Sequence, residues 1–264
     1  MVQLSFCITC MNRFYQISKT LPINLKNNSV NSYEIEFILV DFNSQDGLQE
    51  WVFKNFQSEL HTGYLKYYHT KKMKSWHACI AKNTSHMLGN GKILVNLDAD
   101  NFTGLNGGKY ILDIYHKYGI HNTIMHMYSG WSNGSCGRIA VSKNLFLEVG
   151  GYDQNLGPMG MEDIDLLGRL INYDVNYKNN FILSDPSVIQ EILDLQIHNY
   201  IPLLIDEKFV KTIKNTFEDS FSNIKNNKNP EKIALDNYNM IMNNKLQKKY
   251  VSNLEKTHLG IQII

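Results

Sequence analysis

The sequence predicts an α/β fold in which a mostly parallel sheet is flanked by helices. Three short runs rich in Ile, Leu and Val each end in polar residues, at Leu4–Thr9, Glu36–Gly47 and Gly91–Asn101. Apolar runs of this kind are typical of strands buried on both faces, as in parallel sheets. Longer segments with helical spacing separate the runs, and this alternation is typical of a doubly wound sheet.

Two helices are expected between these runs. The first covers YQISKTLPINLKN, with apolar residues at Ile17, Leu21 and Leu25. The second covers WHACIAKNTSHMLGNG, where Gly89 and Gly91 mark its end. Polar residues follow the C-terminal end of each predicted strand, which is where open α/β sheets bind ligands.

The residue composition changes from Tyr128 onward. YSGWSNGSCGRIAVSK is rich in Gly and Ser and predicts loops around a short strand. GGYDQNLGPMGMEDIDLLGRLINY predicts a glycine-rich loop and then a helix that begins near Glu162, supported by the i,i+4 pair Asp165 and Arg169. We expect one α/β domain at residues 1–200 and a mostly helical appendage at 201–264.

The composition argues against several classes of protein. The chain has 264 residues, a net charge of +1 and 43% hydrophobic residues, so it can bury a real core but lacks the basic surface of a general nucleic-acid binder. We find no signal peptide and no run long enough to span a membrane, and we expect a cytoplasmic protein. The appendage has ten Lys and seven acidic residues, too weak a charge to hold a membrane surface alone, and peripheral membrane association stays open.

The four cysteines do not form a disulfide framework. Cys7 and Cys10 make a CxxC pair, which suits redox chemistry or half of a zinc site. Cys7 lies inside an apolar run, and no second pair completes a zinc site, which favours buried structural thiols in a reducing compartment.

The stretch LVNLDADN ends a predicted strand with Asp98 and Asp100. Residues i and i+2 of a strand point to the same side, so both carboxylates can face one hard divalent cation such as Mg²⁺ or Mn²⁺. Two alternatives stay open here. Asp and Asn are common turn residues at strand ends. Phosphatases of the haloacid dehalogenase type place DxDx(T/V) after a strand, although Phe102 holds the fifth position and Thr103 comes one place late.

A second acidic group, Glu162, Asp163 and Asp165, crowds the first turn of the helix in GMEDIDLLGRL. Acidic residues at a helix N-terminus also complement the helix dipole, which is the simpler explanation. The glycines that precede them allow the backbone to approach a ligand closely, and a carboxylate held there suits a general base.

Taken in order, these motifs resemble the GT-A glycosyltransferases, notably families 2 and 7, over about two thirds of the chain. SFCITCMNR resembles their "hhhPxxNR" strand and turn, with Thr9 in place of proline, and ILVDFNSQDG matches "hhVDnnSxDg". HACIAKNTSHMLGNGKILVNLDADN resembles "xarNxgxxxAxGxhhxhlDaDn". SCGRIAVSK and the acidic block resemble the β-1,4-galactosyltransferases, except that Met159 and Met161 flank Gly160 where that family often has tryptophan and glycine.

The resemblance implies a nucleotide-sugar site, most often for a UDP-sugar, with Mn²⁺ or Mg²⁺ as cofactor. Asp98 and Asp100 would hold the metal, with a downstream histidine, His198, as a further ligand. Asp163 would be the general base of an inverting transfer to a carbohydrate or lipid-linked glycan acceptor in surface-polysaccharide synthesis. The remaining residues would line the donor pocket (Thr9, Asn12, Arg13, Asp41, Asn43, Asn83, Ala99) or bind the acceptor (Trp131, Gly160, Glu162, Asp165).

Other functions stay open at this point. A retaining transferase shares the fold and the DxD motif. A sugar nucleotidyltransferase would need a glycine-rich "GGxGTRL"-type loop, which is absent, and a non-catalytic module would not need Asp98, Asp100 and Asp163 together. The appendage has three open roles: forming a homodimer, covering the acceptor site or contacting a partner.

Overall fold

The computed structural model describes residues 1–120, 123–126, 136–173, 230–246 and 262–263. In chain order its strands are β1 (Leu4–Cys10), β2 (Ile35–Asp41), β3 (Leu65–His69), β4 (Ile93–Asn96), β5 (Ile124–His126), β6 (Ile139–Ser142) and β7 (Gln262–Ile263). The helices are α1 (Phe14–Asn28), α2 (Leu48–Asn55), α3 (Gln57–Thr62), α4 (Ala78–Leu88), α5 (Gly107–Tyr118), α6 (Lys143–Glu148), α7 (Glu162–Tyr173) and α10 (Pro230–Leu246), with a 3₁₀ turn at Ser29–Asn31.

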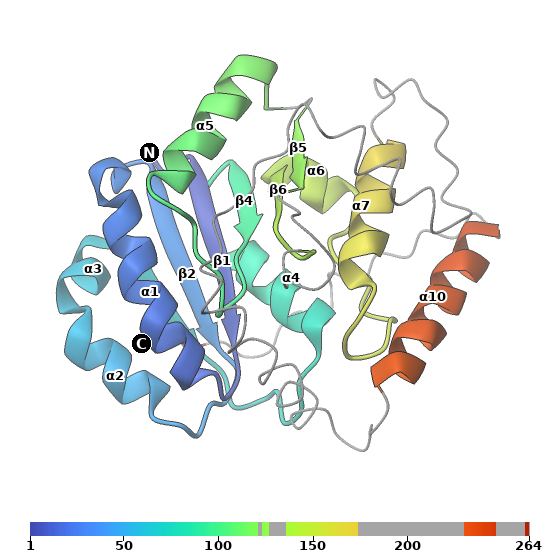
Figure 1. The fold of residues 1–264 in the computed structure, drawn as a ribbon, viewed down its shortest axis with the longest axis horizontal. Helices are drawn as coiled ribbons and strands as arrows, with labels where there is room; N and C mark the ends of the chain where they lie inside the picture. Colours follow the sequence, from blue (N-terminus) through green and yellow to red (C-terminus); the bar gives the residue numbers. More distant parts are fainter. Residues whose placement is uncertain (121–122, 127–135, 174–229, 247–261, 264) are drawn as a thin grey trace.

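The strands form one sheet in the order β5-β6-β4-β1-β2-β3-β7. Figure 1 labels the part of this sheet from β5 to β2. The four central strands are parallel, and β6, β5 and β7 add to the edges in antiparallel orientation. The predicted α/β fold with a parallel core is confirmed. Two details of the prediction were wrong. The strand that leads to LDAD is the fourth in the chain, because β3 precedes it, and it ends at Asn96, so Asp98 and Asp100 lie in the turn after the strand and not at positions i and i+2 within it.

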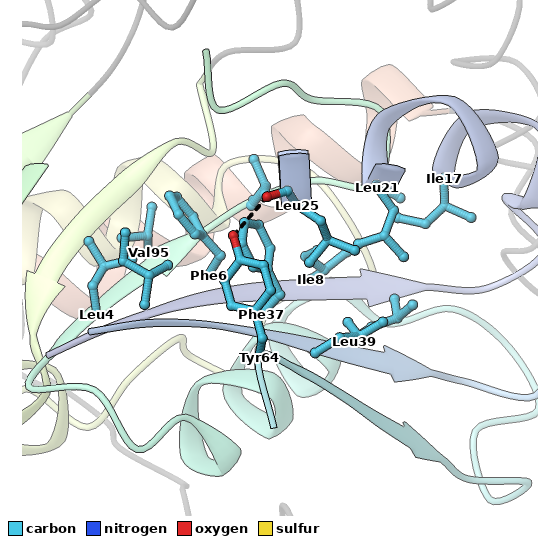
Figure 2. Packing of buried hydrophobic residues seen from close by; sticks show 14 of the residues in the cluster. Leu4, Phe6, Ile8, Ile17, Leu21, Leu25, Phe37, Leu39, Tyr64 and Val95 are labelled. Atoms are coloured by element: carbon cyan, nitrogen blue, oxygen red, sulfur yellow. Dashed lines mark hydrogen bonds between the residues drawn. The ribbon is translucent and has the colours of Figure 1, made fainter. Parts of the chain in front are cut away.

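The central strands are buried on both faces, as their apolar runs predict. Alternate residues of β1, including Leu4, Phe6 and Ile8, pack with α1 and α5 on one face. Figure 2 shows this cluster around Phe6 and Phe37, where the Tyr64 hydroxyl donates to Leu25 O at 2.9 Å. Cys7 points to the opposite face and joins the cluster under α6 and α7. Both CxxC thiols are fully buried and free, which confirms their predicted burial.

Local signals set the helix ends close to their predicted places. α1 and α4 cover the two predicted helical segments, and α4 ends at Gly89. α7 begins at Glu162, and its Asp165 pairs with Arg169 at 2.6 Å, as the i,i+4 spacing predicts. Two described pieces of the appendage, α10 and β7, contact the rest of the chain, while the proposed boundary at residue 200 stays a prediction.

Candidate active site

The candidate site lies at the carboxyl ends of β1, β2 and β4, which are neighbours in the sheet. Cys10 pairs with Asp41 in the parallel register of β1 and β2, and Cys7 pairs with Asn96 at the end of β4. The polar residues that follow each strand therefore meet at one edge, the usual ligand-binding edge of such sheets. Thr9 lies here, almost fully buried in β1.

The loops after β1 and β2 are joined by hydrogen bonds. The Asn12 N–H donates to Ser44 Oγ at 2.9 Å, and the Gln45 N–H donates to Asn12 Oδ1 at 2.8 Å. Asn12 and Asn43 both have left-handed backbone, with φ of 53° and 65°, which asparagine tolerates better than most residues. Arg13 follows as the residue that caps α1.

Asp41, one of the residues predicted to line the donor pocket, is buried at the end of β2. Its Oδ1 accepts from the Ser44 N–H at 2.8 Å and its Oδ2 accepts from the Tyr67 hydroxyl at 2.7 Å. Burial, with the Asp41 carboxylate adding to it, raises the pKa of Tyr67, so this tyrosine stays a neutral donor. Each carboxylate oxygen has two lone pairs, so Asp41 keeps acceptor capacity for a ligand.

The DxD segment, residues 98–100, forms a turn directly after β4. The Asn96 amide donates to Asp98 Oδ1 at 3.1 Å, and the Asn101 amide donates to Asp100 Oδ1 at 2.6 Å. The Thr20 hydroxyl of α1 donates to the carbonyl of Ala99 at 2.5 Å, and this hydrogen bond holds the turn against α1.

Charges of both signs surround Asp100. Burial and the neighbouring Asp98 carboxylate raise the pKa of Asp100 to about 6, against the opposing pull of the Asn101 amide, Arg13 and Arg138. Arg138 is itself almost fully buried and donates from Nε to Asn101 Oδ1. The site thus combines two close carboxylates with two guanidinium groups, a suitable setting for a metal-bound phosphate.

A buried lysine of α4, which was not predicted from the sequence, pairs with the acidic residues at the start of α7. Lys82 of α4 donates to Glu162 Oε1 at 3.0 Å and to Asp163 Oδ1 at 2.6 Å. The three side chains are 6%, 8% and 13% exposed, so this is a buried ion-pair cluster. Lys82 thereby ties α4 to the first turn of α7, two helices that Figure 1 shows next to each other.

The three groups of this cluster have pKa values shifted in different directions. Burial alone lowers the pKa of Lys82, but Asp163 and Glu162 outweigh it and raise that pKa well above its usual value. Burial raises the pKa of Glu162, but the attraction of Lys82 outweighs it and the net pKa is lowered. Burial raises the pKa of Asp163 to about 7, with Lys82 opposing and the Glu162 and Asp98 carboxylates adding to the rise. A carboxylate with a pKa near neutrality suits a general base.

The two acidic motifs meet across the backbone of Gly137. A β-carbon placed on Gly137 would lie 3.1 Å from Asp163 Oδ2, 3.2 Å from Asp98 Oδ2 and 3.2 Å from the Asn96 amide nitrogen. Both carboxylate oxygens therefore lie close to one point, beside a residue that has no side chain. Asp163 Oδ1 is occupied by Lys82, whereas no hydrogen bond from the described residues reaches its Oδ2.

Several predicted residues have mainly structural contacts in the described part of the chain. Asn83 is fully buried, and both ends of its amide bond the backbone of Tyr152, at 2.8 and 2.7 Å. Asp165 is held by Arg169, which also donates to Val149 O at 2.8 Å. Asn43 Oδ1 accepts from the Gln45 side chain at 3.1 Å. The binding roles given to these residues stay predictions, and Trp131 and His198 lie outside the described residues.

Asp98 and Asp100 are the described side chains that could hold a divalent cation at the donor site. No group of three or more His, Cys, Asp and Glu side chains within the described ranges could hold a metal ion. Mg²⁺ is commonly bound by one or two carboxylates together with substrate phosphates and waters. Asp98 and Asp100 fit that pattern, because they are hard oxygen donors close enough to raise the pKa of Asp100.

Sequence reasoning missed three residues of the site: Lys82, Gly137 and Arg138. Each sits next to a segment that was recognised, Lys82 directly before Asn83, and Gly137 and Arg138 directly before the short strand β6. A charged residue on a helix is normally taken as exposed. Only the partner carboxylates, 80 and 81 positions away, make the burial of Lys82 favourable.

No family model and no curated protein matches this sequence. The fold is similar to that of solved structures, all at low identity. A mannosyltransferase from Pyrobaculum calidifontis, in complex with GDP-Man and Mn²⁺, is 16% identical with a TM-score of 0.51, covering 64% of this chain and 51% of that one. TarS 1–349 of S. aureus, in complex with UDP, is 12% identical with a TM-score of 0.50, covering 94% and 92%.

A third similar structure is GalNAc-T7 with UDP, GalNAc and Mn²⁺, at 14% identity and a TM-score of 0.51, covering 64% of this chain and 40% of that one. The chain thus spans about half the length of the mannosyltransferase and less of GalNAc-T7. Among the described residues, no helix is both long and apolar enough to cross a bilayer. The likeness, together with the sheet order and the strand-end site, establishes the fold as that of the GT-A glycosyltransferases.

Proposed function

We propose that this protein is a metal-dependent glycosyltransferase. It moves a sugar from a nucleotide-sugar, a UDP-sugar in our proposal, to an acceptor hydroxyl with inversion at the anomeric carbon. The observation that carries the proposal is the meeting of Asp98 and Asp163 across Gly137, on a GT-A fold. The closeness of these two carboxylates supports a donor-side role for Asp98 next to Asp163 as the base.

The donor would bind at the ends of β1, β2 and β4. Asp98 and Asp100 would hold Mn²⁺ or Mg²⁺, with His198 proposed as a further ligand. When bound, the metal would offset the charge that develops on the departing diphosphate. Arg13 and Arg138 would add positive charge on the same side, since both act on Asp100. Asp41 would accept a hydrogen bond from the nucleobase of the donor. Thr9, Asn12 and Asn43 would line the nucleotide pocket.

The acceptor would be activated by Asp163. As the acceptor oxygen forms its bond to the anomeric carbon, the bond from that carbon to the diphosphate oxygen breaks and the nucleoside diphosphate leaves with the electron pair. The acceptor proton passes to Asp163 Oδ2, the oxygen that Lys82 leaves open. A pKa of about 7 keeps a large fraction of Asp163 ready to accept this proton at neutral pH.

Lys82 and Glu162 would hold the base in place. Lys82 fixes Asp163 Oδ1, which turns Oδ2 toward Asp98. Glu162 balances the charge of the lysine and is buried, which supports an orienting role over direct acceptor binding. Gly160, Trp131 and Asp165 remain proposed acceptor residues, and a carbohydrate or lipid-linked glycan used in surface-polysaccharide synthesis remains the proposed acceptor class.

The ligands of the similar structures support the donor class. UDP occurs in two of those complexes and GDP-Man in the third, and Mn²⁺ occurs in two of them. These ligands share a nucleoside diphosphate and differ in base and sugar. The fold likeness also weighs against a dehalogenase-type phosphatase, because the aspartates follow the fourth strand of a GT-A sheet.

The direct test is turnover of nucleotide-sugars. Purified protein with Mn²⁺ is incubated with single UDP-sugars and GDP-mannose, in the presence of a panel of p-nitrophenyl glycosides. We expect release of one nucleoside diphosphate together with a glycosylated product whose new linkage, read by NMR, has the opposite anomeric configuration to the donor. Retention of configuration would contradict the role of Asp163 as base, and absence of turnover with every donor would contradict the proposed activity.

A further inference from the structure

The loop that leads into the acidic helix holds a strained backbone. Gly160 has φ of 93° and Met161 has φ of 68°, and both lie directly before Glu162 and Asp163. A residue with a side chain rarely adopts positive φ, so Met161 needs its surroundings to keep it there. Whatever holds residues 157–161 therefore also sets the direction in which α7 begins.

Helix α10, in the C-terminal appendage, makes the contacts that hold this loop. The Gly157 N–H donates to Asn237 Oδ1 at 2.6 Å, and the Asn237 amide nitrogen donates to Gly160 O at 2.8 Å and to Met159 O at 3.3 Å. Asn237 is 2% exposed, so its whole amide is committed to the loop.

The same helix face fits closely against the loop glycines. A β-carbon on Gly157 would meet Asn237 Oδ1 at 2.9 Å and Ile233 at 3.1 Å, and one on Gly160 would meet the Ala234 β-carbon at 3.4 Å. Ile233 and Asn237 are one helical turn apart and both are buried. The end of α10 beyond them packs Met240 and Ile241 against the hydrophobic cluster that includes α7.

The α/β domain also holds this loop, through the start of α4. The Ala78 N–H at the start of α4 donates to Pro158 O at 2.8 Å. The loop is thus fixed between α4, which carries Lys82, and α10. An apolar residue would pack at this buried position at least as well as an asparagine. The three hydrogen bonds from Asn237 to the loop therefore indicate a role in setting the loop conformation.

We propose that α10 forms one wall of the acceptor site, with Asn237 as the positioning residue that sets residues 157–161 and, through them, the acceptor side of Asp163. The inference rests on the proposed transferase function and names a part of the chain that the resemblance does not cover. Of the three roles left open for the appendage, this proposal selects the one in which it covers the acceptor site. The donor site at the strand ends does not depend on it.

The test compares Asn237→Leu with Asn239→Leu in the full chain. Asn239 lies on the same helix and is exposed, so the control makes the same chemical change where no loop contact exists. For each variant we would measure the Kd for UDP with Mn²⁺, the KM for donor and for a glycoside acceptor, kcat, and hydrogen exchange of the peptide that spans residues 157–161.

We expect Asn237→Leu to speed exchange of the loop amides about tenfold or more, to raise the acceptor KM by a similar factor, and to leave the UDP Kd and donor KM within about twofold. Asn239→Leu should match the parent in every measurement. Unchanged loop exchange, or equal losses in donor and acceptor KM, would overturn the inference. If the parent itself binds no nucleotide, the proposed function fails separately, and the exchange data still decide whether Asn237 holds the loop.

A second variant guards against simple misfolding. Gly157→Ala places a methyl group 2.9 Å from Asn237 Oδ1, on a backbone that is not left-handed. If the two residues touch in solution, the Gly157→Ala change should cost less in acceptor KM when Asn237 is already alanine than in the parent. Strictly additive effects in this double-mutant cycle would contradict the contact.

Discussion

Replacing Lys82 with methionine removes the cation from a cluster of two buried carboxylates. The parent joins Lys82 to Glu162 and Asp163 at 3.0 and 2.6 Å, with all three side chains at most 13% exposed. Removing one partner of a buried ion pair costs about 3–5 kcal/mol, because the remaining charge has neither water nor a counterion. We expect a loss of this size in the free energy of unfolding at pH 7.

The loss should depend on pH in a defined direction. Without Lys82 the folded protein keeps Glu162 neutral by binding a proton, which the unfolded chain releases above its ordinary carboxyl pKa of about 4. Asp163, with a pKa of about 7, carries its proton over most of this range in the parent as well. The folded state then holds more protons than the unfolded state, so stability falls as pH rises, by about 1.4 kcal/mol per pH unit for each extra proton. The variant should therefore lose about 3 kcal/mol less at pH 5 than at pH 7, because Glu162 is the one carboxyl group that gains a proton relative to the parent.

Urea unfolding of the parent and Lys82→Met at pH 5 and pH 7 measures this. Lys109→Met is the matched control, because Lys109 makes an equally short pair with Asp113 at 2.5 Å while both side chains are at least half exposed. Exposed pairs contribute about 0–1 kcal/mol, so the control should lose little at either pH. A Lys82→Met loss below about 1 kcal/mol, equal at both pH values, would refute the buried cluster.

Three further predictions concern the chemistry. Asp163→Asn should keep Mn²⁺-dependent UDP binding and lower kcat for transfer by about 10²–10⁴, and transfer equal to the parent would show that another group is the base. Because Asp163 acts when deprotonated and its pKa is about 7, kcat/KM should fall as pH drops from 8 to 6, and a flat profile across that range would contradict the assignment. Gly137→Ala should weaken transfer and lower the free energy of unfolding by about 1–3 kcal/mol, because its methyl group would crowd Asp163, Asp98 and Asn96, and a fully active and fully stable variant would mean that these groups do not converge there.

Much of the fold could be predicted from local patterns. β1, β2 and β4 are mostly apolar runs, which are typical of strands buried on both faces, and polar residues mark the ligand edge at their ends. α7 begins where a glycine-rich loop meets Glu162, Asp163 and Asp165, residues that favour a helix start whether or not they catalyse. Local signals of this kind need no knowledge of distant contacts.

Other parts depend on contacts that local patterns do not encode. β3 was missed because LKYYH is short and has a lysine in its second position, yet it pairs with β2 over Leu65–His69. β7 has only two residues, and its pairing with β3 comes from almost 200 positions further along the chain. Lys82 looks like a surface residue until α7 brings its carboxylates to it, and Asn237 looks like any polar residue of an exposed helix.

The measurement that tests the account most directly is calorimetry of the full chain with UDP, with and without Mn²⁺, repeated with Asp100→Ala. The account predicts UDP binding that requires Mn²⁺ in the parent and is lost in Asp100→Ala, while both proteins unfold cooperatively. UDP binding that is independent of Mn²⁺ and unchanged in Asp100→Ala would contradict a metal-held diphosphate at the end of β4. If UDP does not bind at all, GDP and CMP are tested next, and the absence of binding for all three would contradict a nucleotide-sugar site.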